Sequence, residues 1–216
     1  MRINEQGRSM IEMLGVLAIV GVLSVGGIAG YSKAMNKFKT NKAIDQINMM
    51  STNVRTLYSS QKTYGGLINK VAIRTGVIPN EMYSDTSTST MNNAFGGEAQ
   101  ISAATHVMED DSFVIAIDKI PAASCVSIAT TEWGGDSGSG LVAMAILSGG
   151  KIDEVTNMLS GKTKEDDGTG SSDPDEEIKD NASSGYVATV SQLPISVVAA
   201  GSYCVGDENA IAWKYL

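Results

Sequence analysis

The feature that most constrains this chain is an unbroken apolar run near its N-terminus. Residues 10–30 form ~21 positions in which Glu12 is the only charged side chain, and as a helix they would be about 31 Å long. That length matches the hydrocarbon thickness of a bilayer, so the run predicts a transmembrane helix. It is longer than the apolar region of a signal peptide, and no small-x-small cleavage motif follows it.

The single carboxylate in this run needs an explanation. A charged side chain at the bilayer centre costs about 2.5–3.5 kcal/mol, and less near the interface, so Glu12 needs a partner or a position facing water. One interpretation is a plain membrane anchor with Glu12 at the interface. The other depends on Gly7, because a cut after this glycine would make Glu12 the fifth residue of the processed chain.

Helical periodicity continues beyond Tyr31 into a more polar sequence. Apolar residues recur every three or four positions, which predicts one buried face of a helix that ends near Gln61. We therefore expect one helix of ~50 residues whose second half lies under a globular head. The predicted stripe consists of Ala34, Met35, Phe38, Ile44, Ile47, Met50, Val54, Leu57 and Tyr58.

Short apolar segments punctuated by glycine and proline make up the rest of the chain. Helices are predicted between Gly66 and Pro79 and from Asp153 to Gly161. Residues 122–131 fit either a helix or a strand. The segment 85–98 is expected to be a loop. Apolar and β-branched runs predict strands at 99–104, 112–118, 140–150 and 209–216.

Composition excludes several classes of function. The formal net charge is −8 and the basic residues are not clustered, so no nucleic-acid partner is expected. The one histidine, His106, has no serine or cysteine motif around it, so we do not expect an enzyme. Trp133 and Trp213 are interpreted as head packing. No cofactor is expected.

An acidic, Gly/Ser-rich stretch at residues 161–185 predicts an exposed loop. Its carboxylates Asp173, Asp175 and Glu176 are a weak candidate calcium site, because calcium prefers oxygen ligands. A solvated loop is the stronger interpretation, and no other metal site is expected.

The two cysteines, Cys125 and Cys204, are candidates for a disulfide. In an oxidising compartment a bridge across a loop of this length would stabilise the fold by ~4 kcal/mol. Two buried free thiols are the alternative.

The Gly7–Glu12 spacing, followed by the apolar helix, resembles the N-terminus of the type IV pilin superfamily. In that family a peptidase cuts on the cytoplasmic side after a glycine and methylates the new N-terminus. The resemblance implies that residues 1–7 are a leader and that Arg8, where the family usually has Phe or Met, becomes the methylated residue. Glu12 would then neutralise the terminal ammonium of a neighbouring subunit and set the register of assembly.

Features of the head resemble the type IVb branch of the superfamily. They are Gly76 with Ile78–Pro79, Ile120–Pro121 with Cys125, and Cys204 with Trp213. The resemblance implies an α+β pilin fold. A long N-terminal helix at 8–62, with its transmembrane part at 10–30, would pack against an antiparallel sheet in a head at 63–216.

The resemblance also implies a structural subunit of an extracellular pilus-like filament, inserted in the inner membrane as a precursor. Its expected partners are other subunits, a prepilin peptidase, an assembly ATPase, a membrane platform protein and, before assembly, membrane lipid. A minor pilin or a secretion-system pseudopilin is an alternative within this class. A membrane-anchored periplasmic binding module is an alternative of another class.

Glycines weaken the predicted transmembrane helix. Each one inside a helix costs roughly 0.5–1 kcal/mol relative to alanine. Filaments of the superfamily often contain a melted stretch in this span, commonly at a proline that this chain lacks. We expect Gly21, Gly26 and Gly27 to supply a soft segment instead. Close helix packing through Gly26 and Gly30 is the competing interpretation.

Overall fold

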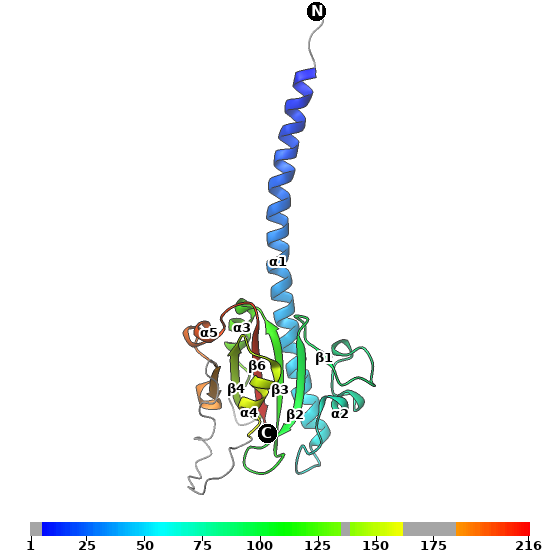
Figure 1. Ribbon diagram of the computed structural model, residues 1–216, viewed down its shortest axis with the longest axis vertical. Helices are drawn as coiled ribbons and strands as arrows, with labels where there is room; N and C mark the ends of the chain where they lie inside the picture. The colour runs from blue at the N-terminus through cyan, green and yellow to red at the C-terminus, as the bar shows by residue number, and fades with distance from the viewer. Residues whose placement is uncertain (1–5, 135–138, 162–184) are drawn as a thin grey trace, which may run out of the picture. The chain divides into compact units, whose positions relative to one another are not determined.

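The computed structural model describes residues 6–134, 139–161 and 185–216 (Figure 1). The chain divides into two compact units, Met1–Lys39 and Thr40–Leu216. Most of the predicted acidic loop, residues 162–184 with Asp173, Asp175 and Glu176, lies outside the described residues.

The first element is a single long helix, α1 (Gln6–Tyr58). Its end at Tyr58 comes three residues before the predicted end at Gln61. The helix is continuous through Gly21, Gly26 and Gly27 in this isolated chain. The expected soft segment concerns the filament, so it stays a prediction.

Six strands of the described chain form one antiparallel sheet in the order β1-β2-β3-β6-β4-β5. The predicted strands are confirmed, and the last strand of the sequence lies near the middle of the sheet. The strands are β1 (Met91–Asn92), β2 (Glu98–Ala104), β3 (Ser112–Ile120), β4 (Leu141–Ser148), β5 (Gly185–Thr189) and β6 (Asn209–Tyr215).

The prediction that 85–98 is entirely loop was wrong at β1. Met91 pairs with Ala99 because a tight turn reverses the chain between them. In that turn the Asn93 Oδ1 accepts hydrogen bonds from the backbone N–H groups of Phe95 and Gly97. A side-chain amide that bridges its own turn in this way is a common turn device.

Short helices surround the sheet. Residues 122–131, which fitted either a helix or a strand, form α3, where Pro121 precedes the first turn with a φ of −61°. The helix predicted before Pro79 ends at Arg74, because Gly76 adopts a φ of 75° that terminates it. The helices are α2 (Asn69–Arg74), η1 (Asn80–Met82), α3 (Ala122–Ala129), α4 (Ile152–Leu159), η2 (Val190–Gln192) and α5 (Val197–Tyr203).

The sheet of the head has apolar side chains on both faces, each covered by a helix (Figure 1). One face packs against the stripe of α1 formed by Ala43, Ile47, Met50, Val54 and Tyr58. On the other face, α4 contributes Ile152, Val155 and Leu159 to a smaller cluster. The α+β class with a long helix on an antiparallel sheet is thereby confirmed.

Two details of the predicted core need comment. The prediction of a buried stripe was wrong at Ala34, Phe38 and Leu57, because these side chains are exposed in this chain. Ala34 and Phe38 belong to the N-terminal unit rather than to the head. Trp133 and Trp213 pack with ring centroids 4.9 Å apart, so their interpretation as head packing is confirmed.

Candidate functional site

The N-terminal part of α1 is apolar and has no cover within the described chain. Among the described residues, α1 is the one helix long and apolar enough to cross a membrane. Side chains such as Leu17, Ile19 and Val22 are more than half exposed. A run of exposed apolar side chains this long marks a surface that meets lipid or another protein.

Glu12 lies near the start of this exposed helix, and among the side chains that the structure describes, which begin at Met10, none forms an ion pair with it. Gly7 and Arg8, the predicted cleavage and methylation positions, lie in the first turns of α1. The structure therefore keeps these residues within a few helical turns of one another.

Helical geometry places several glycines on the side of α1 that carries Glu12. At 3.6 residues per turn, Gly30 follows Glu12 by about five full turns, and Gly15, Gly26 and Gly27 fall within about 60° of the same direction. Gly21 lies about 180° away, on the opposite side of the helix.

None of these glycines is required by the fold of the single chain. A Cβ atom built at Gly15, Gly21, Gly26, Gly27 or Gly30 would meet no described atom within 4 Å. All five positions have helical backbone, so none needs the left-handed conformation that favours glycine. The fold of the described chain would therefore accept a larger side chain at each of these five positions.

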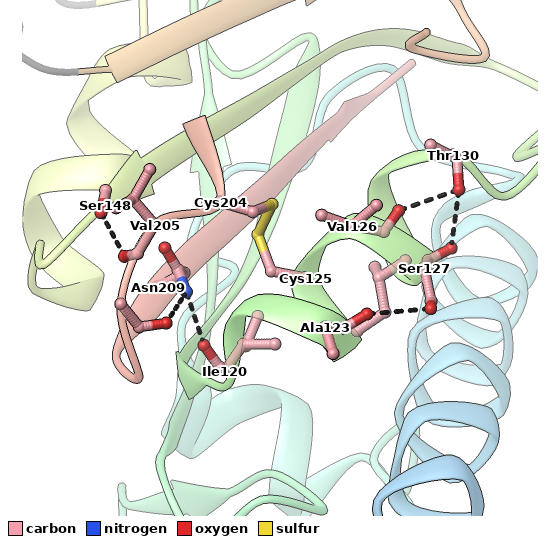
Figure 2. Close-up of a disulfide and its surroundings, with 12 residues drawn as sticks. Ile120, Ala123, Cys125, Val126, Ser127, Thr130, Ser148, Cys204, Val205 and Asn209 are labelled. Atoms are coloured by element: carbon pink, nitrogen blue, oxygen red, sulfur yellow. Dashed lines mark hydrogen bonds between the residues drawn. A yellow bond between two sulfur atoms is a disulfide. The ribbon is translucent and has the colours of Figure 1, made fainter. Parts of the chain in front are cut away.

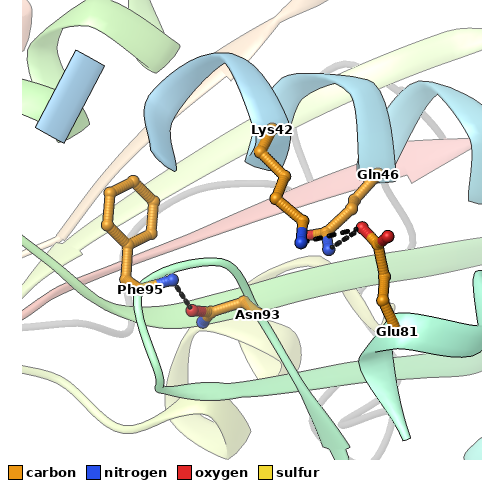
Figure 3. Close-up of polar contacts among 5 residues, drawn as sticks. All are labelled: Lys42, Gln46, Glu81, Asn93 and Phe95. Carbon is orange, nitrogen blue, oxygen red and sulfur yellow. Dashed lines mark hydrogen bonds and ion pairs between the residues drawn. The ribbon is translucent and has the colours of Figure 1, made fainter. Parts of the chain in front are cut away.

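Polar contacts hold the head half of α1 against the rest of the head. Figure 3 shows Lys42 and Gln46, one turn apart on α1, directed at Glu81 of η1. The Gln46 Nε2 donates to the Glu81 carboxylate at 2.9 Å, and the Lys42 Nζ lies 3.3 Å from it. These hydrogen bonds, from Gln46 first and Lys42 second, lower the pKa of Glu81.

Two further contacts hold the same stretch of helix. The Thr40 hydroxyl donates to Ser124 of α3 at 2.9 Å, and the Asn53 amide donates to the backbone carbonyl of Val77 at 3.0 Å. α1 is therefore held along its head half by polar contacts as well as by its apolar stripe.

A disulfide closes the head, as predicted. Cys125 on α3 is bonded to Cys204, which follows α5, across a sequence separation of 79 residues (Figure 2). The alternative of two free thiols is wrong, since the cysteines are bonded and both are buried. The bridge joins two helices that lie far apart in the sequence.

One well-organised loop was not predicted from the sequence. The Asp111 carboxylate accepts hydrogen bonds from the backbone N–H groups of His106, Val107 and Met108, at 2.7–2.8 Å. Burial raises the pKa of Asp111. The hydrogen bonds from the three N–H groups together lower this pKa by more than burial raises it, so the net pKa shift is downward.

Comparison with known proteins supports a family assignment. A family model described as PilS N terminal matches residues 37–171. The matched range covers more than half of the chain, but it begins after Gly7, Arg8 and Glu12. These three residues are therefore not tested by the match.

Two curated relatives are each named the major structural subunit of bundle-forming pilus, one from Escherichia coli O127:H6 (strain E2348/69 / EPEC) and one from Escherichia coli O111:H-. Each is 30% identical to this chain over 130 residues, which is 60% of this chain. The chain spans 66% of the length of these relatives.

Solved structures with similar folds include a type IV b pilin from Salmonella typhi, with a TM-score of 0.46, 16% identity, and coverage of 81% of this chain and 98% of that one. Another is TcpA, a type IV pilin from Vibrio cholerae El Tor biotype, with a TM-score of 0.45 and 14% identity. That comparison covers 82% of this chain and 99% of the other.

Proposed function

Because this chain belongs to the type IV pilin family described by the PilS model, we propose that it is a structural, non-enzymatic subunit of an extracellular pilus. Its relatives in Escherichia coli are named as major structural subunits, which favours a major pilin over a minor pilin or a pseudopilin. The part of α1 that lies in the N-terminal unit is the assembly element of the subunit. The disulfide-closed head forms the filament surface.

The exposed apolar half of α1 is the observation on which this function depends. A soluble head of this size, with its own sheet and two apolar clusters, has no need of a further exposed apolar helix. Before assembly, lipid would cover that helix, and in the filament the helices of neighbouring subunits would replace lipid. Because lipid is as apolar as these side chains, close van der Waals packing among the helices, rather than removal of apolar surface from water, would drive their association.

Glu12 gives this apolar association its register. In a bundle of apolar helices an unpaired carboxylate is strongly disfavoured, whereas a carboxylate that meets a cation is stabilised. Cleavage after Gly7 would create an ammonium group at Arg8, which is methylated in the family. We propose that Glu12 of one subunit pairs with this group on the next subunit, and that subunits in other registers are rejected.

Glycines on the Glu12 side of α1 fit the same role. Gly15, Gly26 and Gly30 leave space on the helix surface that the chain itself does not fill. Small residues in this arrangement let two helix backbones approach closely. They would bring the neighbouring helix near enough for the Glu12 pair to form.

Processing and assembly need partners that the family implies. We propose a leader at residues 1–7, a precursor in the inner membrane, a prepilin peptidase, an assembly ATPase and a membrane platform protein. In the processed chain the long helix would then run from Arg8 to Tyr58, and residues 10–30 of this helix would span the membrane before assembly.

Substitution of Glu12 separates a filament subunit from a membrane anchor. In cells that supply the assembly machinery, Glu12→Gln removes the charge and keeps the size of the side chain, and we expect sheared filaments to fall below about one hundredth of wild type. The protein should stay in the membrane fraction. Asp45→Asn, on the exposed side of the same helix, is the matched control and should leave filaments unchanged.

Mass spectrometry of the same samples tests processing. The wild-type protein should lose the residues before Arg8 and gain one methyl group on the new N-terminus. Normal filaments from Glu12→Gln would contradict the proposed role of Glu12 in assembly. A protein that retains residues 1–7, with no filaments from wild type, would contradict the proposed function and favour the anchored binding module.

A further inference from the structure

A basic segment follows the apolar run of α1. No Asp or Glu lies between Glu12 and Asp45 in the sequence. The same stretch contains four lysines, three of which, Lys33, Lys37 and Lys39, belong to the N-terminal unit. This unit has five basic and two acidic side chains, so it carries a formal net charge of +3, whereas the whole chain carries −8. The N-terminal unit is thus opposite in charge to the protein as a whole.

These three lysines make no ion pair with another described residue. The ion pair that lies among the described residues joins Lys42 to Glu81, and both of these belong to the head. Lys33 and Lys37 are exposed, and Lys39 is half-buried. Within the described chain, the charges of the three lysines are therefore open to a partner.

The lysines encircle the helix together with two aromatic side chains. Tyr31 is 68% exposed and Phe38 is 60% exposed. At 3.6 residues per turn, Phe38 lies within about 20° of Tyr31 around the helix axis. Lys33 and Lys37 lie about 160° and 120° from Tyr31 on one side, and Lys39 lies about 80° from it on the other. We call these five residues the lysine ring.

We propose that the lysine ring binds the anionic headgroups of phospholipids in the leaflet at the C-terminal end of the apolar span. The inference rests on the proposed function, since it requires residues 10–30 to cross a bilayer before assembly. The lysine ammonium groups pair with lipid phosphates. Tyr31 lies at the boundary between hydrocarbon and headgroups, where tyrosine is enriched in membrane proteins.

The rise of the helix places the ring at the depth of the headgroups. At 1.5 Å per residue, Lys33 lies about 4–5 Å beyond Gly30, where the apolar run ends, and Lys37 lies about 10 Å beyond it. The headgroup layer on each side of the hydrocarbon is about 5–8 Å thick. Side chains of a helix tilt toward its N-terminus, so the lysine stems lead back toward the span and bring the ammonium groups to the phosphates.

Other occupants fit the ring less well. A protein partner covers one side of a helix, whereas lipid headgroups surround a helix that crosses the membrane, as the side chains of the ring do. The span also holds lipid beside the ring. A soluble polyanion would instead be repelled by the head, because residues 40–216 hold 22 acidic and 11 basic side chains.

The ring is not explained as a signal for membrane topology. Lysines that flank a span normally mark its cytoplasmic side. In the proposed function, cleavage after Gly7 takes place on that side, so the ring lies on the other. Binding of anionic headgroups gives the lysines a role in that leaflet.

Quenching of tryptophan by brominated lipids tests this inference. Val25→Trp places a reporter in the apolar span, where position 25 is 71% exposed, while the native Trp133 and Trp213 are buried in the head. The full chain is reconstituted in equimolar vesicles of phosphatidylcholine and phosphatidylglycerol, with bromine on the acyl chains of one lipid or the other. Lys33 and Lys37 should enrich phosphatidylglycerol beside the reporter about fivefold, the factor that one lysine near an anionic lipid surface supplies.

Removal of the charges gives the matched comparison. In Lys33→Gln/Lys37→Gln the enrichment should fall below about twofold. Lys62→Gln/Lys70→Gln removes the same charge from exposed positions of the head and should keep the enrichment. Equal quenching by the two brominated lipids, or an enrichment that survives the loss of Lys33 and Lys37, would overturn the inference.

The two proposals fail differently in this experiment. If neither brominated lipid quenches the reporter, residues 10–30 do not lie in the bilayer, and the membrane stage of the proposed function fails together with the inference. If both lipids quench it equally, the span lies in lipid and the inference alone fails. The measurement is made without filaments, so its outcome does not depend on assembly.

Discussion

The two parts of α1, one in each compact unit of the chain, both carry large apolar side chains but meet opposite surroundings. In the head, Ile47 and Met50 are fully buried against the sheet. In the N-terminal unit, Leu17 and Ile19 are mostly exposed, and no described residue covers them. The side chains of the head half of α1 are therefore set by packing within the chain. In the proposed function, those of the N-terminal half are set by contact with lipid and with other subunits.

Glycines show the same contrast. In the head, Gly161 has a φ of 66°, and a Cβ there would lie 2.1 Å from the carbonyl oxygen of Thr105. Gly76 has a φ of 75° where α2 ends. Gly26 and Gly30 have neither constraint. At Gly161 and Gly76 glycine is required by the chain's own conformation, whereas at Gly26 and Gly30 it is not.

Loss of the disulfide should give the largest change in the free energy of unfolding, and this change should be confined to the head. Replacing both cysteines in Cys125→Ala/Cys204→Ala should lower the free energy of unfolding of the head by about 4 kcal/mol, because the bridge closes a long loop. Denaturant unfolding of detergent-solubilised subunits, followed by tryptophan fluorescence, measures it. A loss below about 1 kcal/mol would mean that α3 and α5 are held by packing alone.

A matched pair of substitutions on α1 tests the contrast directly. Ile47→Ala should destabilise the head by about 2–5 kcal/mol, because it leaves a cavity in the core. Ile19→Ala should change the same free energy by less than about 0.5 kcal/mol, because Ile19 is 62% exposed. Equal effects on head unfolding would show that the two parts of the helix fold as one unit.

Much of the fold follows from local patterns in the sequence. The apolar residues Ile47, Met50, Val54 and Tyr58 recur at helical spacing, and the strands β2, β3, β4 and β6 are short apolar or β-branched runs, most of them bounded by glycine or proline. The two cysteines left one pairing to consider. Glu12 stood out because a lone carboxylate in an apolar run has few explanations.

The rest required tertiary information. Residues 185–204 show no clear period, and α5 forms there although its first two residues are β-branched valines, because Ser196 caps it and Cys204 ties it to α3. The Asp111 loop depends on three backbone groups that a sequence does not display. α3 and α5 become neighbours only through the fold, where the Cys125–Cys204 disulfide joins two segments that are 79 residues apart.

A smaller loss of stability is expected when the Asp111 loop is altered. Asp111→Asn should destabilise the head by about 1–2 kcal/mol, since an amide cannot replace both carboxylate oxygens as acceptors. The pKa of Asp111 is lower in the folded head than the usual 3.8. Its contribution is therefore present above pH 3.8 and is lost as the pH falls through the lowered folded-state pKa.

Unfolding measured at several pH values checks this prediction. Wild type should lose more stability than Asp111→Asn as the pH falls below about 4, so the two curves should converge in acid. Parallel curves would mean that the carboxylate charge does not matter to the loop. Glu81, whose pKa is also lowered, is unchanged in both proteins and its contribution cancels in the comparison.

Alanine in place of single glycines should have the smallest effect on the subunit and can separate the two interpretations of the N-terminal unit. Each change adds roughly 0.5–1 kcal/mol of helix propensity in an exposed helix. No described atom lies within 4 Å of the new methyl group, so head unfolding should not change. Any differences between these variants and wild type should therefore arise in the filament alone.

A soft segment and a close helix contact predict different patterns among these variants. If local softness matters, Gly21→Ala, Gly26→Ala and Gly27→Ala should all reduce filament extension under force to a similar degree. If close packing matters, Gly26→Ala and Gly30→Ala should reduce filament yield, while Gly21→Ala should not, because Gly21 lies on the side of the helix opposite Glu12. Yield and single-filament stretching of these four variants would therefore show whether the N-terminal unit is shaped by flexibility or by a neighbouring helix.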